Sequence, residues 1–155
     1  MLTIDPQTNI AQIFVMNGGK HPVFDIRLRI CDLECLEQIA PTNGVNIIET
    51  CNRTLGIPSL HASHAMVVGQ MALEDDSIRR FNIFWSARNG DHVQLLRLIT
   101  VNGVWQQASR VTRGNEVLHE QLFPGFPPEA LGSDWKGEPA EPPPCSPGPP
   151  LSCTS

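Results

Sequence analysis

Apolar and polar residues alternate with a period of two along much of the chain. The pattern is clearest in VFDIRLRI at residues 23–30. One side carries Phe24, Ile26, Leu28 and Ile30, and the other carries Asp25, Arg27 and Arg29. This alternation predicts a strand with one buried and one solvated face, as is typical of antiparallel sheets.

A second apolar run, IAQIFVM at residues 10–16, comes shortly before that strand. Asn17 and Gly18 stand between the two runs. Asn-Gly readily supplies the positive backbone angles that a tight hairpin turn requires. We therefore expect residues 10–16 and 23–30 to pair as a hairpin.

The second half of the chain contains four strand-like runs separated by glycine-containing turns. The runs are residues 80–88, 93–101, 104–111 and 116–122, and the turns are residues 89–91, 102–103 and 113–115. This regular spacing predicts a meander of antiparallel hairpins.

The middle of the chain has a less regular pattern. Residues 32–40 place apolar side chains at helical spacing and stop before Pro41, which predicts a short helix. Residues 47–51 and 63–73 resemble two further strands, and Gly56, Pro58 and Gly69 interrupt the pattern. We expect an all-β fold, an antiparallel β-sandwich of about seven or eight strands, with a closed barrel as the alternative.

Proline divides the chain into a body and a tail. Ten of the fourteen prolines lie after residue 123, and the final residues are rich in Pro, Gly, Glu and Ser. Such a composition offers few backbone donors and little apolar surface. We expect a β-sandwich domain over residues 9–127 and a disordered tail over residues 128–155.

Charge and hydropathy limit the classes of partner. The net charge is -5 and the isoelectric point is near 5.4, so nucleic-acid binding lacks its usual electrostatic driving force. The first residues do not resemble a signal peptide, and no apolar run is long enough to span a bilayer. The sequence therefore leaves localisation open: cytoplasmic by default, or membrane-associated if an N-terminal anchor precedes it.

Cysteine and histidine residues in the first half suggest one candidate metal site. Five cysteines, two of them in the tail, do not indicate a disulfide framework. Thiolate and imidazole are ligands that zinc prefers, although the spacing lacks the usual C-x2-C pairs. We expect ordinary buried thiols, no metal and no cofactor. The alternative is a zinc site drawn from Cys31, Cys35, Cys51, His61 and His64.

The sequence shows no arrangement typical of an enzyme active site. Neither G-x-S-x-G nor H-E-x-x-H occurs, and the glycine pair at residues 18–19 does not open a helix. Trp85 and Trp105 share their strand phases with apolar residues, which favours core packing over a sugar-binding surface. We therefore predict no catalytic residues.

Arginine provides nearly all the positive charge of the predicted strands. Arg97 is unusual because it shares its phase with apolar residues, which predicts either a half-buried pair with a carboxylate or a contact with a partner. Arginine is also enriched at protein interfaces. The candidates for partner binding are Arg27, Arg29, Arg97 and Arg110.

Several strand and turn segments are similar to the β-rich C-terminal region of uncharacterised bacterial proteins, some of them membrane-anchored. The segments are residues 22–33 (PVFDIRLRICDL), 81–90 (FNIFWSARNG), 95–98 (LLRL) and 101–105 (VNGVW). The resemblance covers about residues 10–127. It implies an all-β fold with an anchor or partner segment upstream, and it implies no activity or site residues.

These observations favour a non-enzymatic interaction module. Its expected ligand is a protein partner or a segment of its own parent chain. The alternative is a small zinc- or thiol-dependent enzyme that uses the cysteine and histidine cluster.

Overall fold

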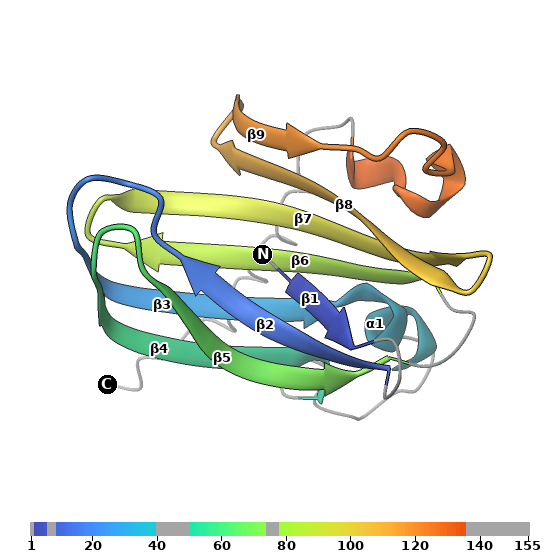
Figure 1. The fold of residues 1–155 in the computed structure, drawn as a ribbon, viewed down its shortest axis with the longest axis horizontal. Helices are drawn as coiled ribbons and strands as arrows, with labels where there is room; N and C mark the ends of the chain where they lie inside the picture. Colours follow the sequence, from blue (N-terminus) through green and yellow to red (C-terminus); the bar gives the residue numbers. More distant parts are fainter. Residues whose placement is uncertain (1, 6–8, 40–49, 74–77, 136–155) are drawn as a thin grey trace, which may run out of the picture.

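The computed structural model describes residues 2–5, 9–39, 50–73 and 78–135. Within these residues the chain forms nine strands, one α-helix and two short 3-10 helices. The strands make two antiparallel sheets that pack face to face (Figure 1). The predicted fold class, an antiparallel β-sandwich with one short helix, is confirmed.

The larger sheet contains six strands in the order β4-β3-β6-β7-β8-β9. Asn102 and Gly103, which join β7 to β8, both have positive φ, at 53° and 74°, as the predicted tight turn requires. The four consecutive strands β6 to β9 form the predicted meander. The bounds are β3 Val23–Asp32, β4 Asn52–Leu60, β6 Arg79–Ala87, β7 Gly90–Val101, β8 Val104–Arg113 and β9 Glu116–Gln121.

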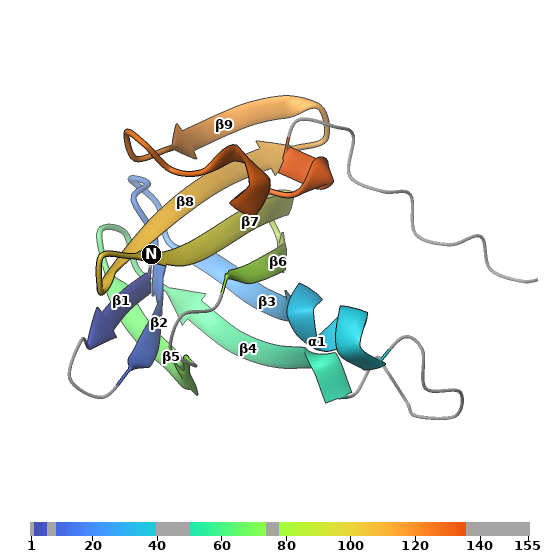
Figure 2. The same ribbon diagram turned by 90° about the vertical axis from the view of Figure 1, so that its right-hand side faces the viewer.

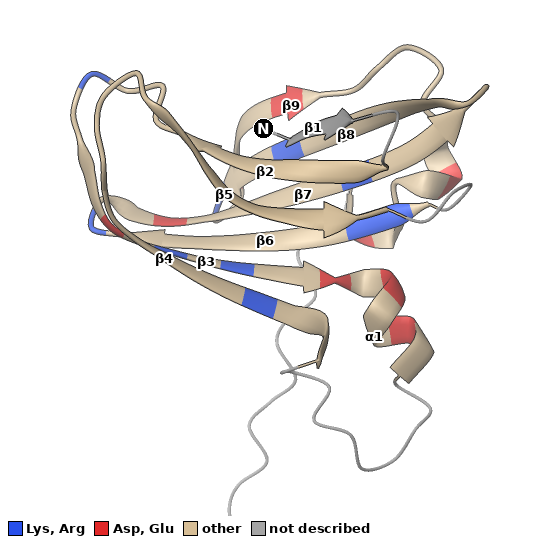
Figure 3. Ribbon diagram, turned by 60° about the horizontal axis from the view of Figure 1, so that its bottom comes forward, with Lys and Arg blue, Asp and Glu red and all other residues tan. Residues whose placement is uncertain are grey.

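The smaller sheet has the order β1-β2-β5. Its strands are β1 (Leu2–Asp5), β2 (Ile10–Met16) and β5 (Ala65–Ala72). Neither β2 nor β5 contains a charged residue, so both strands are uniformly tan in Figure 3. The sequence pattern predicted β2 and β5 and missed β1, which is only four residues long.

The predicted hairpin between residues 10–16 and 23–30 is wrong. Strand β2 pairs with β1 and β5, whereas β3 pairs with β4 and β6 in the other sheet. The residues after Met16 therefore cross from one layer to the other. Ile13 and Val15 of β2 and the alternating residues from Ile26 to Ile30 of β3 face the same core, so hydrophobic alternation alone does not distinguish a facing strand from a neighbouring one. Phe24, predicted on that buried face, is instead 45% exposed, because the positive φ of Asp25 interrupts the alternation between Phe24 and Ile26.

The chain between β3 and β5 agrees only in part with its sequence pattern. Helix α1 (Leu33–Ile39) confirms the predicted helix. Of the predicted strand at residues 47–51, residues 47–49 lie outside the described residues, and residues 50 and 51 are helical. Strand β4 instead begins at Asn52 and runs through Gly56 and Pro58. Proline is tolerated there because β4 is an edge strand, where a backbone donor can be absent without breaking a ladder.

Two apolar clusters stabilise the sandwich, one on each face of the large sheet. The main core lies between the sheets and includes Val15, Leu28, Phe81 and Leu98. A second cluster covers the outer face of β7 and β8, where residues 126–135 fold back over the sheet (Figure 2). It contains Leu95, Ala108, Phe126, Ala130, Leu131 and Trp135.

The packed part of the chain therefore continues beyond the predicted boundary at residue 127. Two short 3-10 helices, Pro128–Ala130 and Ser133–Trp135, each place a buried residue on the sheet. The proline-rich composition concealed this segment, because its apolar residues are few and widely spaced. The remainder of the predicted tail, residues 136–155, lies outside the described residues.

Candidate binding cleft between the sheets

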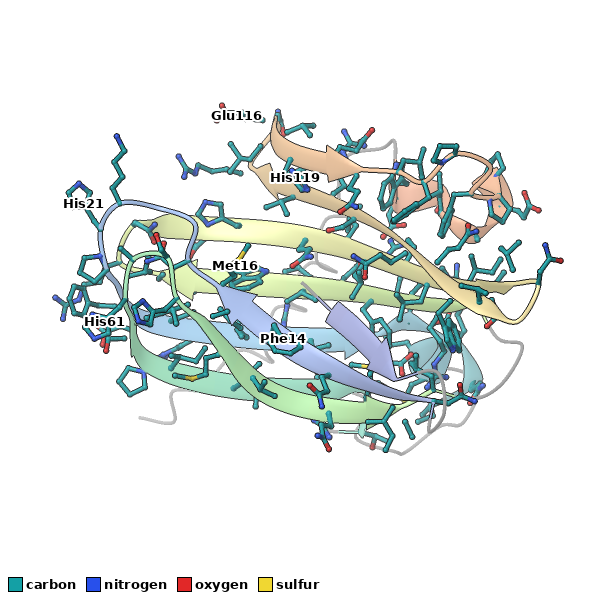
Figure 4. All side chains as sticks on the ribbon, in the orientation of Figure 1. Phe14, Met16, His21, His61, Glu116 and His119 are labelled. Atoms are coloured by element: carbon teal, nitrogen blue, oxygen red, sulfur yellow. A yellow bond between two sulfur atoms is a disulfide. The ribbon has the colours of Figure 1, made fainter. Side chains whose placement is uncertain are left out.

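A cleft of about 390 Å³ opens between the two sheets at one end of the sandwich. Strand β1 pairs with residues 10–13 of β2, and the cleft lies beside the other end of β2, at Val15 and Met16. His119 and Gln121 of β9 also line the cleft, and Figure 4 labels His119 on β9 and Met16 on β2. Its volume falls within the range of about 300 to 1,000 Å³ that is common for small-molecule sites.

One wall of the cleft is apolar. It is formed by side chains from β2, β3, β4 and β6, together with Leu96 of β7. These residues continue the main core outward to the cleft, so the wall is supported by close packing. The apolar side chains are Val15, Met16, Val23, Ile26, Leu60, Trp85, Ala87 and Leu96.

The other wall carries mainly polar, uncharged side chains from β7, β8 and β9, with the apolar Val111 of β8 among them. The polar side chains are His92, Gln94, Gln107, Ser109, His119 and Gln121. Buried amides and hydroxyls cost free energy unless they are hydrogen-bonded, so they are uncommon on the inner face of a sandwich. Gln94 satisfies this requirement in part, because its Nε2 donates a hydrogen bond of 2.9 Å to Ser109 Oγ.

No Asp, Glu, Lys or Arg occurs among the described residues that line the cleft. The exposed Arg113, which does not line the cleft, contacts the lining at His92: its Nε donates a hydrogen bond of 3.2 Å to His92 Nε2. The lining is therefore suited to an uncharged ligand.

Asn17 fixes the rim of the cleft. Its side-chain Nδ2 donates to the backbone oxygens of His21, Leu60 and His61, at 2.8, 3.1 and 3.2 Å. Its Oδ1 accepts a hydrogen bond from the backbone N–H of Gly19. One buried amide thus joins the loop after β2 to the loop after β4, which keeps the mouth of the cleft in a defined shape.

The candidate zinc ligands do not form one cluster. Cys35 and Cys51 are joined in a disulfide, contrary to the expectation of free thiols. His61 and His64 follow the opposite end of β4 from Cys51. Within the described residues, no group of three potential ligands is placed to hold a metal ion. Sequence spacing missed the disulfide because its cysteines are 16 positions apart, with Cys35 in helix α1 and Cys51 directly before β4, and they meet only in the fold.

Cys31 is a free, buried thiol at the end of β3. Burial raises the pKa of this thiol, the nearby Arg29 opposes the rise, and Asp32 adds to it. Because the thiolate is the reactive form, a raised pKa makes Cys31 a poor nucleophile at neutral pH. The geometry therefore gives no support to a thiol-dependent active site at this position.

The four candidate arginines occupy different environments. Arg27 and Arg29 are exposed on β3, and the guanidinium of Arg29 lies 4.4 Å from the ring centre of Phe84. Arg110 donates a hydrogen bond to the backbone oxygen of Trp135 and forms an ion pair of 3.4 Å with Glu120. Arg27 and Arg29 thus remain accessible, whereas Arg110 helps to hold the C-terminal segment.

Arg97 is fully buried between the large sheet and the C-terminal segment. Its guanidinium donates to both carboxylate oxygens of Asp134 and to the backbone oxygens of Leu131, Phe81 and Leu96. Burial lowers the pKa of Arg97, and the negative charge of Asp134 opposes this effect. Of the two roles expected for Arg97, the carboxylate pair is the one that the structure contains, with deeper burial than predicted.

Comparison of the chain with models of protein families, with curated proteins and with solved structures finds no match in any of the three. The resemblance to bacterial β-rich proteins therefore stays a prediction. In the part of the chain that the structure describes, no helix is long and apolar enough to cross a membrane.

The pattern of apolar and polar residues along the chain does not reveal the cleft. A retrospective signal exists in β7 and β8, where Gln94, Gln107 and Ser109 occupy positions that face the smaller sheet. Polar residues at inward positions of a sandwich indicate either a satisfied network or a binding surface. The sequence alone does not single out these residues, because which face of each strand points inward depends on how the sheets pack.

Proposed function

We propose that this domain is a non-enzymatic binding module and that the cleft between its sheets holds an uncharged, amphipathic ligand. The observation that carries the proposal is the division of the cleft into an apolar wall and a polar wall without formal charge. Such a surface favours a ligand with an apolar body and hydrogen-bonding groups along one side. A neutral small molecule and an uncharged peptide segment both have this chemistry.

The cleft lacks the features that a catalytic role would need. Of its two histidines, His92 is engaged by Arg113, and no carboxylate lines the described cleft to orient either imidazole. The disulfide between Cys35 and Cys51 also removes two of the thiols that the alternative enzyme would use. The binding role is therefore the better supported of the two.

Titration with matched aromatic probes tests the proposal. We expect 2-naphthol, which is neutral at pH 7, to bind with a single saturable change in fluorescence. We expect 2-naphthoate, its anionic counterpart, to bind at least about tenfold more weakly, because a charge in this lining would have no partner. Equal or stronger binding of the anion would contradict the uncharged character of the site.

Two glutamine-to-tryptophan variants locate the site. Gln121→Trp places a bulky ring at the rim of the cleft, and Gln70→Trp makes the same change on the exposed face of β5, outside the cleft. We expect the first variant to weaken 2-naphthol binding about tenfold or more and the second to leave it unchanged. Equal affinities in the two variants would place the probe elsewhere.

A further inference from the structure

Two histidines in the loop between β4 and β5 stand close together. The ring centroids of His61 and His64 are 5.7 Å apart, with the ring planes tilted by 59°. Zinc binds an imidazole nitrogen at about 2.0 to 2.1 Å, so two imidazoles that share one ion have ring centroids about 5 to 6 Å apart. The observed separation therefore fits two ligands of a single ion.

The hydrogen bond of His64 leaves the correct nitrogen available. Its Nδ1 lies 2.8 Å from the backbone oxygen of Ala62. A carbonyl oxygen has no proton to give, so Nδ1 is the donor, and Nε2 is the nitrogen that is left to bind a metal ion. Histidine ligands commonly donate their second ring nitrogen to a carbonyl oxygen in this way, which orients the ring and increases its basicity.

The loop that carries the two histidines is held in place. Asn17 donates to the backbone oxygens of Leu60 and His61, and the backbone N–H of Asn17 donates to His64 O at 3.0 Å. The same asparagine holds the loop of His21, which lies at the same end of the sandwich (Figure 4). A fixed loop lowers the entropy cost of bringing two imidazoles to one ion.

We propose that His61 and His64 form a surface site for a divalent transition-metal ion that prefers imidazole, such as Zn²⁺ or Ni²⁺. The two side chains supply two ligands and water completes the coordination, because no third potential ligand among the described residues is in place. Neither histidine lines the cleft, so the site is independent of the proposed ligand. The absence of a carboxylate from this pair excludes a preference for Mg²⁺ or Ca²⁺.

Calorimetric titration of the untagged chain with Zn²⁺ tests the site. The tail contains Cys145 and Cys153, whose thiols also bind zinc, so both are replaced by serine in every sample. We expect one equivalent of Zn²⁺ to bind and Mg²⁺ to give no signal at the same concentration. Absence of Zn²⁺ binding at millimolar concentration would overturn the proposal.

Single histidine variants assign the ligands. We expect His61→Gln and His64→Gln each to weaken Zn²⁺ binding at least about tenfold, whereas His119→Gln, on exposed β9, leaves it unchanged. All three residues are exposed, so the variants should fold, which circular dichroism confirms. Unchanged affinity in His64→Gln, or an equal loss in His119→Gln, would show that the pair is not the site.

Discussion

The guanidinium of Arg97 contacts both carboxylate oxygens of Asp134, at 2.9 and 2.8 Å, across 37 positions of sequence. Asp134 also accepts a hydrogen bond from Asn82 Nδ2, so the pair belongs to a small network on the outer face of the large sheet. Since a buried cation without a partner is strongly destabilising, this contact couples the C-terminal segment to the stability of the whole sandwich.

Replacing Asp134 with asparagine should lower the free energy of unfolding by about 3 kcal/mol, because Arg97 loses its countercharge while it stays buried. The same substitution at Asp25, whose pair with Arg88 is exposed, should cost less than about 1 kcal/mol. Denaturation in urea measures both values. If both variants lost the same free energy of unfolding, burial of Arg97 would not be what makes the loss of Asp134 costly.

Truncation should separate the packed segment from the residues that follow it. A chain that ends at Trp135 retains both apolar clusters and should unfold at the same temperature as the full chain. A chain that ends at Pro127 loses Ala130, Leu131, Trp135 and the partner of Arg97, and it should be several kcal/mol less stable. The melting temperatures of the two truncated chains and of the full chain test this prediction. Equal melting temperatures for the two truncated chains would contradict it.

The disulfide between Cys35 and Cys51 joins residues 16 positions apart. Replacing both cysteines with serine should cost about 3 kcal/mol, chiefly by increasing the conformational freedom of the unfolded chain. Thiol titration in denaturant checks the bond directly in a chain whose Cys145 and Cys153 are replaced by serine: the oxidised chain should show one free thiol, that of Cys31, and the reduced chain three. Three free thiols without reduction would exclude the bond.

The raised pKa of Cys31 predicts a dependence of stability on pH. The folded protein holds this proton more tightly than the unfolded chain, so the contribution is present below the ordinary thiol pKa of 9.0 and is lost as pH rises through the folded value. Stability of the parent should therefore fall above about pH 9 relative to Cys31→Val, which has no thiol. If the free energies of unfolding of the two proteins changed in the same way above pH 9, this explanation would be wrong.

The side chain of Asn17 should be essential to the rim of the cleft. Asn17→Asp replaces a donor with an anion that faces three carbonyl oxygens, and we expect a loss of about 2 kcal/mol or more. Asn89→Asp makes the same change at an exposed position of the cleft and should cost less than about 0.5 kcal/mol. Urea denaturation of both variants provides the comparison.

Much of the fold was predictable because its signals are local. The meander from β6 to β9 is encoded by alternating side chains and by turns such as Asn102-Gly103, which act within a few residues. The partners of β2 were not predictable, because alternation identifies a buried face without saying which strand lies beside it. The same limit hid the cleft, whose lining comes from β2 in one sheet and from β3, β4 and β6 to β9 in the other.

The environment of Arg97 was predictable only in part. Its position on an apolar strand face was visible in the sequence and predicted a pair with a carboxylate. The identity of Asp134 was not visible, since it lies in a segment whose composition indicated disorder. Trp135, only one residue further on, supplies the apolar contact that holds this segment on the sheet.

The arrangement of β2 and β5 has a consequence for the rate of folding. These two strands pair across a long stretch of chain that also contains β3 and β4, whereas β6 to β9 need only short turns to meet. Closing a long loop costs entropy before the contacts compensate for it, so distant pairings form late. We expect the meander to collapse first and the smaller sheet to dock last, so the cleft between them is completed in the final step.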